Sequence, residues 1–188
     1  MGKIKKGVSM VFFQKMKGGG KRGPSRVGYS EIAWSWIGAF LGITPVALIN
    51  SCFFYDSDLV FIVGSFGASA VLIYGAVRSP LAQPRNLVGG HILSAFIGVL
   101  SYKLFYPFPW FAAAFAVATA IALMHATGTL HPPGGATALI AVIGGENVHA
   151  LGFMYVLVPV ALGVAIMLFV ALVVNNLAKN RRYPEYWY

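Results

Sequence analysis

Residues 127 to 138 read TGTLHPPGGATA and combine two consecutive prolines with two consecutive glycines in an apolar part of the chain. Proline suits the first turn of a helix, where no partner for a backbone N–H is needed, and it favours extended geometry in the residue before it. The run therefore predicts a helix that begins at Pro132 or Pro133 and continues to about Ile143. Such a helix is too short to cross the hydrocarbon core of a bilayer, which is about 30 Å thick.

The whole chain has the composition of an integral membrane protein. Of its 188 residues, 58% are hydrophobic and 10% are charged, and the mean hydropathy is +0.74. Soluble domains carry about 25% charged residues. A soluble enzyme and a nucleic-acid-binding domain are therefore excluded, although the pI is about 9.9. The sequence contains no nucleophile elbow, phosphate loop or zinc-protease motif. We expect an all-α, polytopic helical membrane protein with no enzymatic activity, no cofactor, no metal and no nucleic-acid partner.

About six apolar segments follow one another along the chain, and the second and fifth are short or broken. Their predicted bounds are 32–50, 59–77, 87–104, 110–125, 132–144 and 150–177. We expect three regions: a basic cytoplasmic tail over 1–31, a transmembrane domain over 32–178, and a cytoplasmic C-terminal tail over 179–188.

The basic residues indicate how the chain is oriented. Eight of the 14 lysines and arginines precede position 31. If all six segments cross, Arg78, Arg85 and both termini share one side, and the other side receives three acidic residues and one lysine. The positive-inside rule then puts both termini in the cytoplasm, and we expect the inner (plasma) membrane. If the second and fifth segments are re-entrant instead, Arg78 and Arg85 lie outside. We favour six crossings, two of them broken.

Two short motifs in the second and fifth segments resemble each other. Residues 67–73 read GASAVLI and residues 135–141 read GATALIA. Each half of the chain then consists of three segments with the unusual one in the middle. Because three is odd, the halves would have opposite orientation, which is the inverted repeat found in many transporters. The motifs are short and built from small residues, so chance composition is the alternative.

The start of the fifth segment has the features of an anion site. Glycines let a ligand approach the backbone, and a helix N-terminus carries about half a positive charge. The predicted substrate-binding residues here are His131, Pro132, Pro133, Gly134, Gly135 and Thr137, and the second segment offers the matching set Ser65, Gly67 and Ser69. We expect the bare amide groups of these helix ends to face a polar cavity near the membrane midplane. The alternative is that the small residues only let helices pack closely.

Three further candidates flank or enter the third segment. Arg85 and Asn86 lie at its start, where a cation raises the local concentration of anions. His91 lies inside the segment, and an ionisable group within a span is a functional candidate. The alternatives are that Arg85 only follows the positive-inside rule and that His91 only bonds a neighbouring carbonyl.

Two motifs give a family resemblance. Residues 79–91 read SPLAQPRNLVGGH and residues 131–137 read HPPGGAT. In this order they resemble the HPP family of integral membrane proteins, which is named for the triplet at His131 to Pro133. The resemblance implies four spanning helices and a transport role, and it associates plastid and cyanobacterial relatives with nitrite transport. The short chain resembles a prokaryotic member. Four spans differ from our six, so the second and fifth segments are the ones in dispute.

These observations predict a channel or transporter for a small inorganic anion, with nitrite as the first candidate. Six short segments enclose little space against lipid, so we expect a homo-oligomer in the bilayer. A non-conducting scaffold or accessory subunit is the alternative. A cation or metal carrier is third, because the chain has only five acidic residues and all lie in loops or at segment ends.

Overall fold

The computed structural model describes residues 12, 14–16, 23, 25–53 and 60–188. Within these residues the ordered structure is entirely helical, which confirms an all-α, polytopic helical membrane protein. The helices, in chain order, are α2 (Tyr29–Phe53), α3 (Val60–Ala70), the π-helix η1 (Val71–Gly75), the 3-10 helix η2 (Pro80–Ala82), α4 (Pro84–Phe105), α5 (Pro109–Thr127), α6 (Pro132–Ile143), α7 (Glu146–Leu151), the π-helix η3 (Val156–Ala161) and α8 (Leu162–Leu177).

The helices fall into a long and a short class. Four stretches in the described residues are long and apolar enough to cross a membrane: Tyr29–Ile49, Pro84–Phe105, Pro109–Thr127 and Val156–Leu177. Two shorter apolar helices, Gly64–Gly75 and Pro132–Ile143, lie between them in the chain. The 12 residues of α6 rise only about 18 Å. The four long stretches match the four spans that the family resemblance implies, and the two short helices match the disputed segments.

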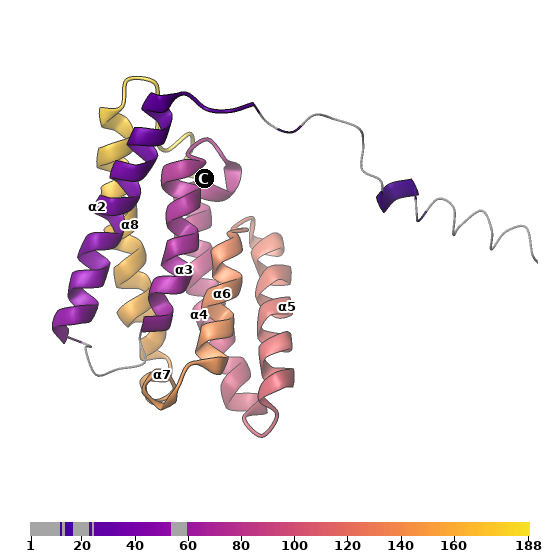
Figure 1. Cartoon of the computed structure of the whole chain (residues 1–188). Helices are drawn as coiled ribbons and strands as arrows, with labels where there is room; N and C mark the ends of the chain where they lie inside the picture. Colours follow the sequence, from indigo (N-terminus) through magenta and orange to yellow (C-terminus); the bar gives the residue numbers. More distant parts are fainter. Residues whose placement is uncertain (1–11, 13, 17–22, 24, 54–59) are drawn as a thin grey trace, which may run out of the picture.

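The short helices connect opposite ends of the bundle. In Figure 1 the chain descends through α2, rises through α3, descends through α4, rises through α5, descends through α6 and rises through α8. Neither α3 nor α6 turns back to the end at which it starts. Within the bundle, α3 and α6 thus run from one end toward the other, and the start of α2 lies at the same end as the end of α8.

Some of the packing is alike in the two predicted halves of the chain. In the first half α2 packs on α3 and η1, and in the second half α5 packs on α6. Each outer helix also packs on the last helix of the other half, α2 on α8 and α5 on α4. The short helices α3 and α6 run side by side in opposite directions at the centre (Figure 1). The extensive packing of α4 on α6 has no equal between the corresponding helices α8 and α3, so the contacts agree with an inverted repeat only in part.

The last pass begins later than the sequence indicates. Segment 150–177 is interrupted after α7 by Gly152, which ends that helix with a φ of 52°. A left-handed φ favours glycine, and the chain turns there before η3 begins at Val156. The first part of the predicted segment therefore belongs to a short connecting helix.

The C-terminal tail packs against the body of the protein. Tyr183 is buried, and its hydroxyl donates a hydrogen bond to the carbonyl of Ala82 at 2.8 Å. The backbone N–H of Glu185 donates to Oε1 of Gln83 at 2.9 Å. Burial raises the pKa of the Tyr183 phenol, so this side chain stays a hydrogen-bond donor at neutral pH. The tail thus covers the loop that joins η1 to α4.

Labelling of single cysteines tests the six-pass topology. In a Cys52→Ser background, Arg78→Cys and Glu146→Cys lie at opposite ends of the bundle, so an impermeable maleimide should reach them from opposite sides of the membrane. Asn180→Cys should react from the same side as Arg78→Cys. Labelling of Arg78→Cys and Glu146→Cys from the same side would instead establish re-entrant segments.

Candidate functional site

Four buried polar side chains meet where α3, α4 and α6 pack together. They are Ser69 of α3, His91 of α4, His131 directly before α6, and Thr137 of α6, and none has any exposed surface. The hydroxyl of Ser69 lies 2.7 Å from Nε2 of His91 and 2.9 Å from Nε2 of His131. We call these four residues the histidine cluster. It is a polar centre inside an apolar bundle.

The outer nitrogens of both imidazoles are also bonded. Nδ1 of His131 lies 2.8 Å from the carbonyl oxygen of Leu81, which follows η1 in the chain. Nδ1 of His91 lies 2.7 Å from the hydroxyl of Thr137, and that hydroxyl lies 3.3 Å from the carbonyl of Pro133. The histidine cluster therefore forms one chain of hydrogen-bonding groups from Leu81 to Thr137, and the carbonyl of Pro133 is a second acceptor within reach of the Thr137 hydroxyl.

The chain fixes the direction of each hydrogen bond when both imidazoles are neutral. A carbonyl only accepts, so Nδ1–H of His131 donates to Leu81 and Nε2 of His131 is an acceptor. The hydroxyl proton of Ser69 then goes to His131, and Ser69 accepts from Nε2–H of His91. Nδ1 of His91 in turn accepts from the hydroxyl of Thr137. Each donor has an acceptor, as burial in a low-dielectric interior requires.

Local sequence explains how each histidine reaches this position. His131 has extended backbone, with φ −138° and ψ 106°, because Pro132 follows it, and α6 begins at Pro132 as predicted. On α4, Gly90 leaves room for His131, since a Cβ at Gly90 would lie 2.5 Å from the Cβ of His131. The ring of Phe66 packs edge-on against His91 with ring centroids 5.6 Å apart.

The N-terminus of α6 does not face a polar cavity, so that expectation is wrong for this conformation. An added Cβ at Gly134 would lie 2.8 Å from Oγ of Ser94 and 3.1 Å from Sδ of Met124. The amide of Gly134 donates to the carbonyl of His131 at 2.8 Å. Protein atoms of α4 and α5 therefore close this helix end. Gly134 permits close packing rather than approach of a ligand.

Other predicted site residues lie away from the histidine cluster. A Cβ at Gly67 would meet nothing within 4 Å, and one at Gly135 would meet only Val117 at 3.9 Å. Pro132 is exposed. Gly135 and Pro132 line an apolar groove of about 530 Å³ between α5 and α6. Gly135 and Pro132 therefore lie on an apolar surface, as the packing alternative expects.

The remaining candidates lie near the cluster. Ser65 is buried about one turn before Ser69. Asn86 donates from Nδ2 to the carbonyl of Leu130 at 2.9 Å, and the exposed Arg85 donates to the carbonyl of Thr127 at 2.6 Å. These two bonds hold the loop between α5 and α6, which places His131. Arg85 and Asn86 thus position the cluster and also keep one positive charge at that end of the bundle.

Two contributors to the cluster were missed by sequence reasoning. Tyr155 is fully buried, and its hydroxyl donates to the carbonyl of Thr137 at 3.0 Å. Its position, directly before the most apolar segment of the chain, is the sequence feature that could have identified Tyr155 as a buried polar residue. The carbonyl of Leu81 carries no side-chain signal, although Leu81 lies inside the first family motif.

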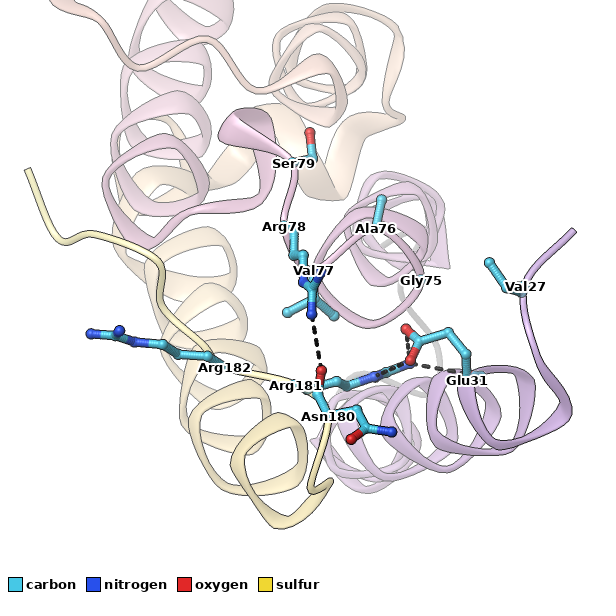
Figure 2. A pocket seen from close by; sticks show the side chains of 10 residues that line it. All are labelled: Val27, Glu31, Gly75, Ala76, Val77, Arg78, Ser79, Asn180, Arg181 and Arg182. Atoms are coloured by element: carbon cyan, nitrogen blue, oxygen red, sulfur yellow. Dashed lines mark hydrogen bonds and ion pairs between the residues drawn. The ribbon is translucent and has the colours of Figure 1, made fainter. Parts of the chain in front are cut away.

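A second polar site lies at the end of the bundle that holds the C-terminal tail. It is a pocket of about 390 Å³ whose charged lining residues are Glu31, Arg78, Arg181 and Arg182. Figure 2 shows Arg181 paired with Glu31, at 2.7 Å, and Arg78 directed at the carbonyl of Asn180, at 3.1 Å. Three arginines against one glutamate give this basic pocket a net charge of +2.

The ends of the bundle differ in charge as the positive-inside rule predicts. Arg78 and Arg181 line the basic pocket, and Arg85 lies at the start of α4. Lys103 lies in the last turn of α4, and Glu146 begins α7, which Figure 1 places at the opposite end of the bundle. The basic side chains among the described residues therefore gather at one end of the bundle.

The comparisons with known proteins agree on a membrane family. A family model described as "HPP, transmembrane region" matches residues 24–184. That range contains every helix from α2 to α8 and also Tyr183 of the C-terminal tail. No solved structure matches the chain.

Two curated relatives come from Dictyostelium discoideum, and each is named a transmembrane protein. One is 49% identical over 180 residues, covering 94% of this chain and 57% of the relative. The other is 48% identical over 181 residues, covering 94% of this chain and 63% of the relative. The chain therefore spans about three fifths of the length of these relatives. A prokaryotic source and a particular membrane stay predictions.

Substitution of Thr137 tests whether the cluster stabilises the fold. Thr137→Val keeps the shape of the side chain but leaves Nδ1 of the buried His91 without its partner. An unsatisfied buried polar atom costs about 1–3 kcal/mol, so the free energy of unfolding in detergent should fall by that amount. Ser101→Ala is the matched control, because the Ser101 hydroxyl bonds only the carbonyl of Ile97 one turn earlier. Equal stability of the two variants would contradict a stabilising role.

Proposed function

Because this chain belongs to the family described as the HPP transmembrane region, we propose that it is a membrane channel or transporter for a small inorganic anion, with nitrite as the first candidate. The matched relatives are named only as transmembrane proteins, so the transported species is inferred from chemistry. The single observation that carries the proposal is the histidine cluster. Ionisable side chains inside a membrane bundle are costly and are usually retained for transport, proton relay or ligand binding.

The chemistry of the cluster favours an anion over a hard metal cation such as Mg²⁺ or Ca²⁺. The buried polar side chains among the described residues are hydroxyls, amides and imidazoles, and none of them is a carboxylate. Hard cations are bound by carboxylate and carbonyl oxygens, whereas hydroxyl and imidazole N–H groups donate to anions. An anion held by Ser69, His91 and Thr137 would meet donors on three sides.

The structure corresponds to a closed state of this site. Each donor of the histidine cluster is bonded to another member or to a carbonyl, and no buried side-chain nitrogen or oxygen in the described residues lacks a partner. An entering anion would replace the hydrogen bonds at Ser69, which requires α3 to shift relative to α4 and α6. Relative motion of the two halves of an inverted repeat around a central site is a common transport mechanism. We therefore place the proposed anion site at the side chains of the histidine cluster and not at the N-terminus of α6.

The basic end of the bundle supports the same proposal. The basic pocket and Arg85 concentrate positive charge at the end where the loop of Leu81 covers His131. Positive charge at a mouth raises the local concentration of anions before they enter. If this end of the bundle and both termini are cytoplasmic, anions would meet the positive charge on the cytoplasmic side of the membrane.

A non-conducting scaffold is the second candidate, and one observation favours it. Gly67 and Gly135 present small, outward-facing surfaces on α3 and α6, which suit close packing against another transmembrane helix. A homo-oligomer formed through this face is compatible with both candidates. Flux measurements distinguish them.

Liposome flux tests the transport proposal. Purified protein in liposomes at pH 7.5 should pass nitrite faster than empty liposomes, which correct for leakage of the protonated acid. His91→Gln keeps a donor toward Ser69 but removes the imidazole, and it should reduce the flux at least about tenfold. His125→Gln, which changes an exposed histidine at the end of α5, should leave it unchanged.

Anion selectivity completes this test. Nitrite, nitrate, formate and chloride should be compared in parallel. Flux equal to that of empty liposomes for all four anions, from protein that is folded and correctly inserted, would reject transport and support the scaffold.

A further inference from the structure

We propose that the histidine cluster is a proton relay, and that the protein moves one proton together with each anion. This inference rests on the proposed transport function and names what accompanies the substrate. It depends on the geometry of the hydrogen-bond chain from Leu81 to Thr137 and on the charged groups that surround it.

The first support is the continuity of the chain. Two imidazoles share one hydroxyl, with distances of 2.7 and 2.9 Å between Oγ of Ser69 and the two Nε2 atoms. A second hydroxyl, that of Thr137, lies 2.7 Å from Nδ1 of His91. Hydroxyl and imidazole groups each accept a proton at one atom and release one at the same or another atom. Every link between His131 and Thr137 can therefore pass a proton.

The second support is that the chain holds one additional proton without losing a bond inside the cluster. With the proton on Nδ1 of His91, this nitrogen donates to Thr137, and the hydroxyl of Thr137 turns to the carbonyl of Pro133. That carbonyl lies 3.3 Å away and is already oriented to accept. Nε2–H of His91 still donates to Ser69, and Ser69 still donates to His131.

The transfer step itself is balanced. Nε2 of His91 gives its proton to Oγ of Ser69 while Ser69 gives its own proton to Nε2 of His131. His91 becomes neutral with its proton on Nδ1, and His131 becomes the imidazolium with protons on both nitrogens. No bond other than N–H and O–H changes, and no other reactant is needed. The excess proton has then moved from α4 to the start of α6.

The third support is the lack of a fixed counter-charge. The cationic and titratable groups nearest the cluster, among the described residues, are Tyr155 between α7 and η3, His125 at the exposed end of α5, Arg85 at the start of α4, and Arg78 and Tyr183 beside the loop of Leu81. Lys103 lies in the last turn of α4. The carboxylates on neighbouring elements do not bond the cluster, because Glu31 of α2 pairs with Arg181 and Glu146 is exposed at the start of α7. A positive charge buried without a partner is strongly unfavourable.

An anion bound at the cluster would supply the missing negative charge. The imidazolium stabilises the anion, and the anion stabilises the imidazolium, so neither is favourable alone inside the bundle. Binding of one therefore requires the other. This mutual dependence couples proton movement to anion movement with a ratio of about one.

Proton movement into liposomes tests the inference. Liposomes carry the pH dye pyranine inside, and the voltage is held at zero with potassium and valinomycin. Nitrate and nitrite are applied in turn, because nitrate does not leak as a neutral acid near pH 7. The interior should acidify as the anion enters, by about one proton per anion, and flux should rise as the external pH is lowered from 7.5 to 6.5.

The outcomes separate the coupling from the transport function. Anion entry without acidification and without pH dependence would overturn the relay and leave a channel. Absence of flux for every anion would overturn the transport function and the relay with it.

Variants of Ser69 localise the relay. Ser69→Ala removes one donor to the anion as well as the link between the histidines. Anion flux should therefore fall, and the number of protons carried per anion in the remaining flux should fall to near zero, whereas Ser69→Thr keeps the hydroxyl and should keep both the flux and the ratio. Ser101→Ala is the control, because it removes a buried hydroxyl on α4 that lies outside the histidine cluster. Thr137→Val, which breaks the last link, gives the same test where Ser69→Ala does not assemble. An unchanged ratio in either link-breaking variant would overturn the proposal.

Discussion

Two buried imidazoles share a single serine hydroxyl, and the centre of the bundle depends on this contact. A polar group inside an apolar bundle must be bonded, because each unmade hydrogen bond costs several kcal/mol in a membrane interior. Ser69, His91 and His131 come from three different helices, so satisfying them fixes the distances between α3, α4 and α6. The small residues around them follow from the same requirement, because an added Cβ at Gly90 or Gly134 would crowd backbone atoms of the neighbouring segment.

The two short helices give this contact its position. The short helices α3 and α6 run side by side in opposite directions at the centre of the bundle, so the residue before α6 lies against α3 and α4 (Figure 1). His131 therefore sits within the protein although it precedes a helix. The long helices α2, α8, α4 and α5 surround this pair and face the lipid with their apolar sides. The family model matches residues 24–184 and so covers the whole arrangement. The match includes Tyr183, which packs on the loop whose Leu81 carbonyl bonds His131.

Sequence reasoning predicted the parts of the fold that are set by local rules. Pro132 sets the start of α6, and the spacing of apolar and basic residues sets six passes with a basic end. His91, His131, Ser69 and Thr137 were all among the predicted residues, but the sequence could not show that they bond one another. The sequence also could not show that protein atoms close the N-terminus of α6, because Ser94 and Met124, which close it, belong to other helices. The same holds for Tyr183, whose partner is a backbone carbonyl.

Nitrogen NMR of the histidine side chains is the most direct measurement of the shared hydrogen bonds. Protein labelled with 15N in its four histidines should show two slowly exchanging imidazoles at neutral pH, His131 with its proton on Nδ1 and His91 with its proton on Nε2. His125, which is exposed, provides the internal comparison. If His91 and His131 instead show the mixed tautomers and rapid exchange of His125, the histidine cluster is not bonded as described, and the transport and relay proposals lose their physical basis.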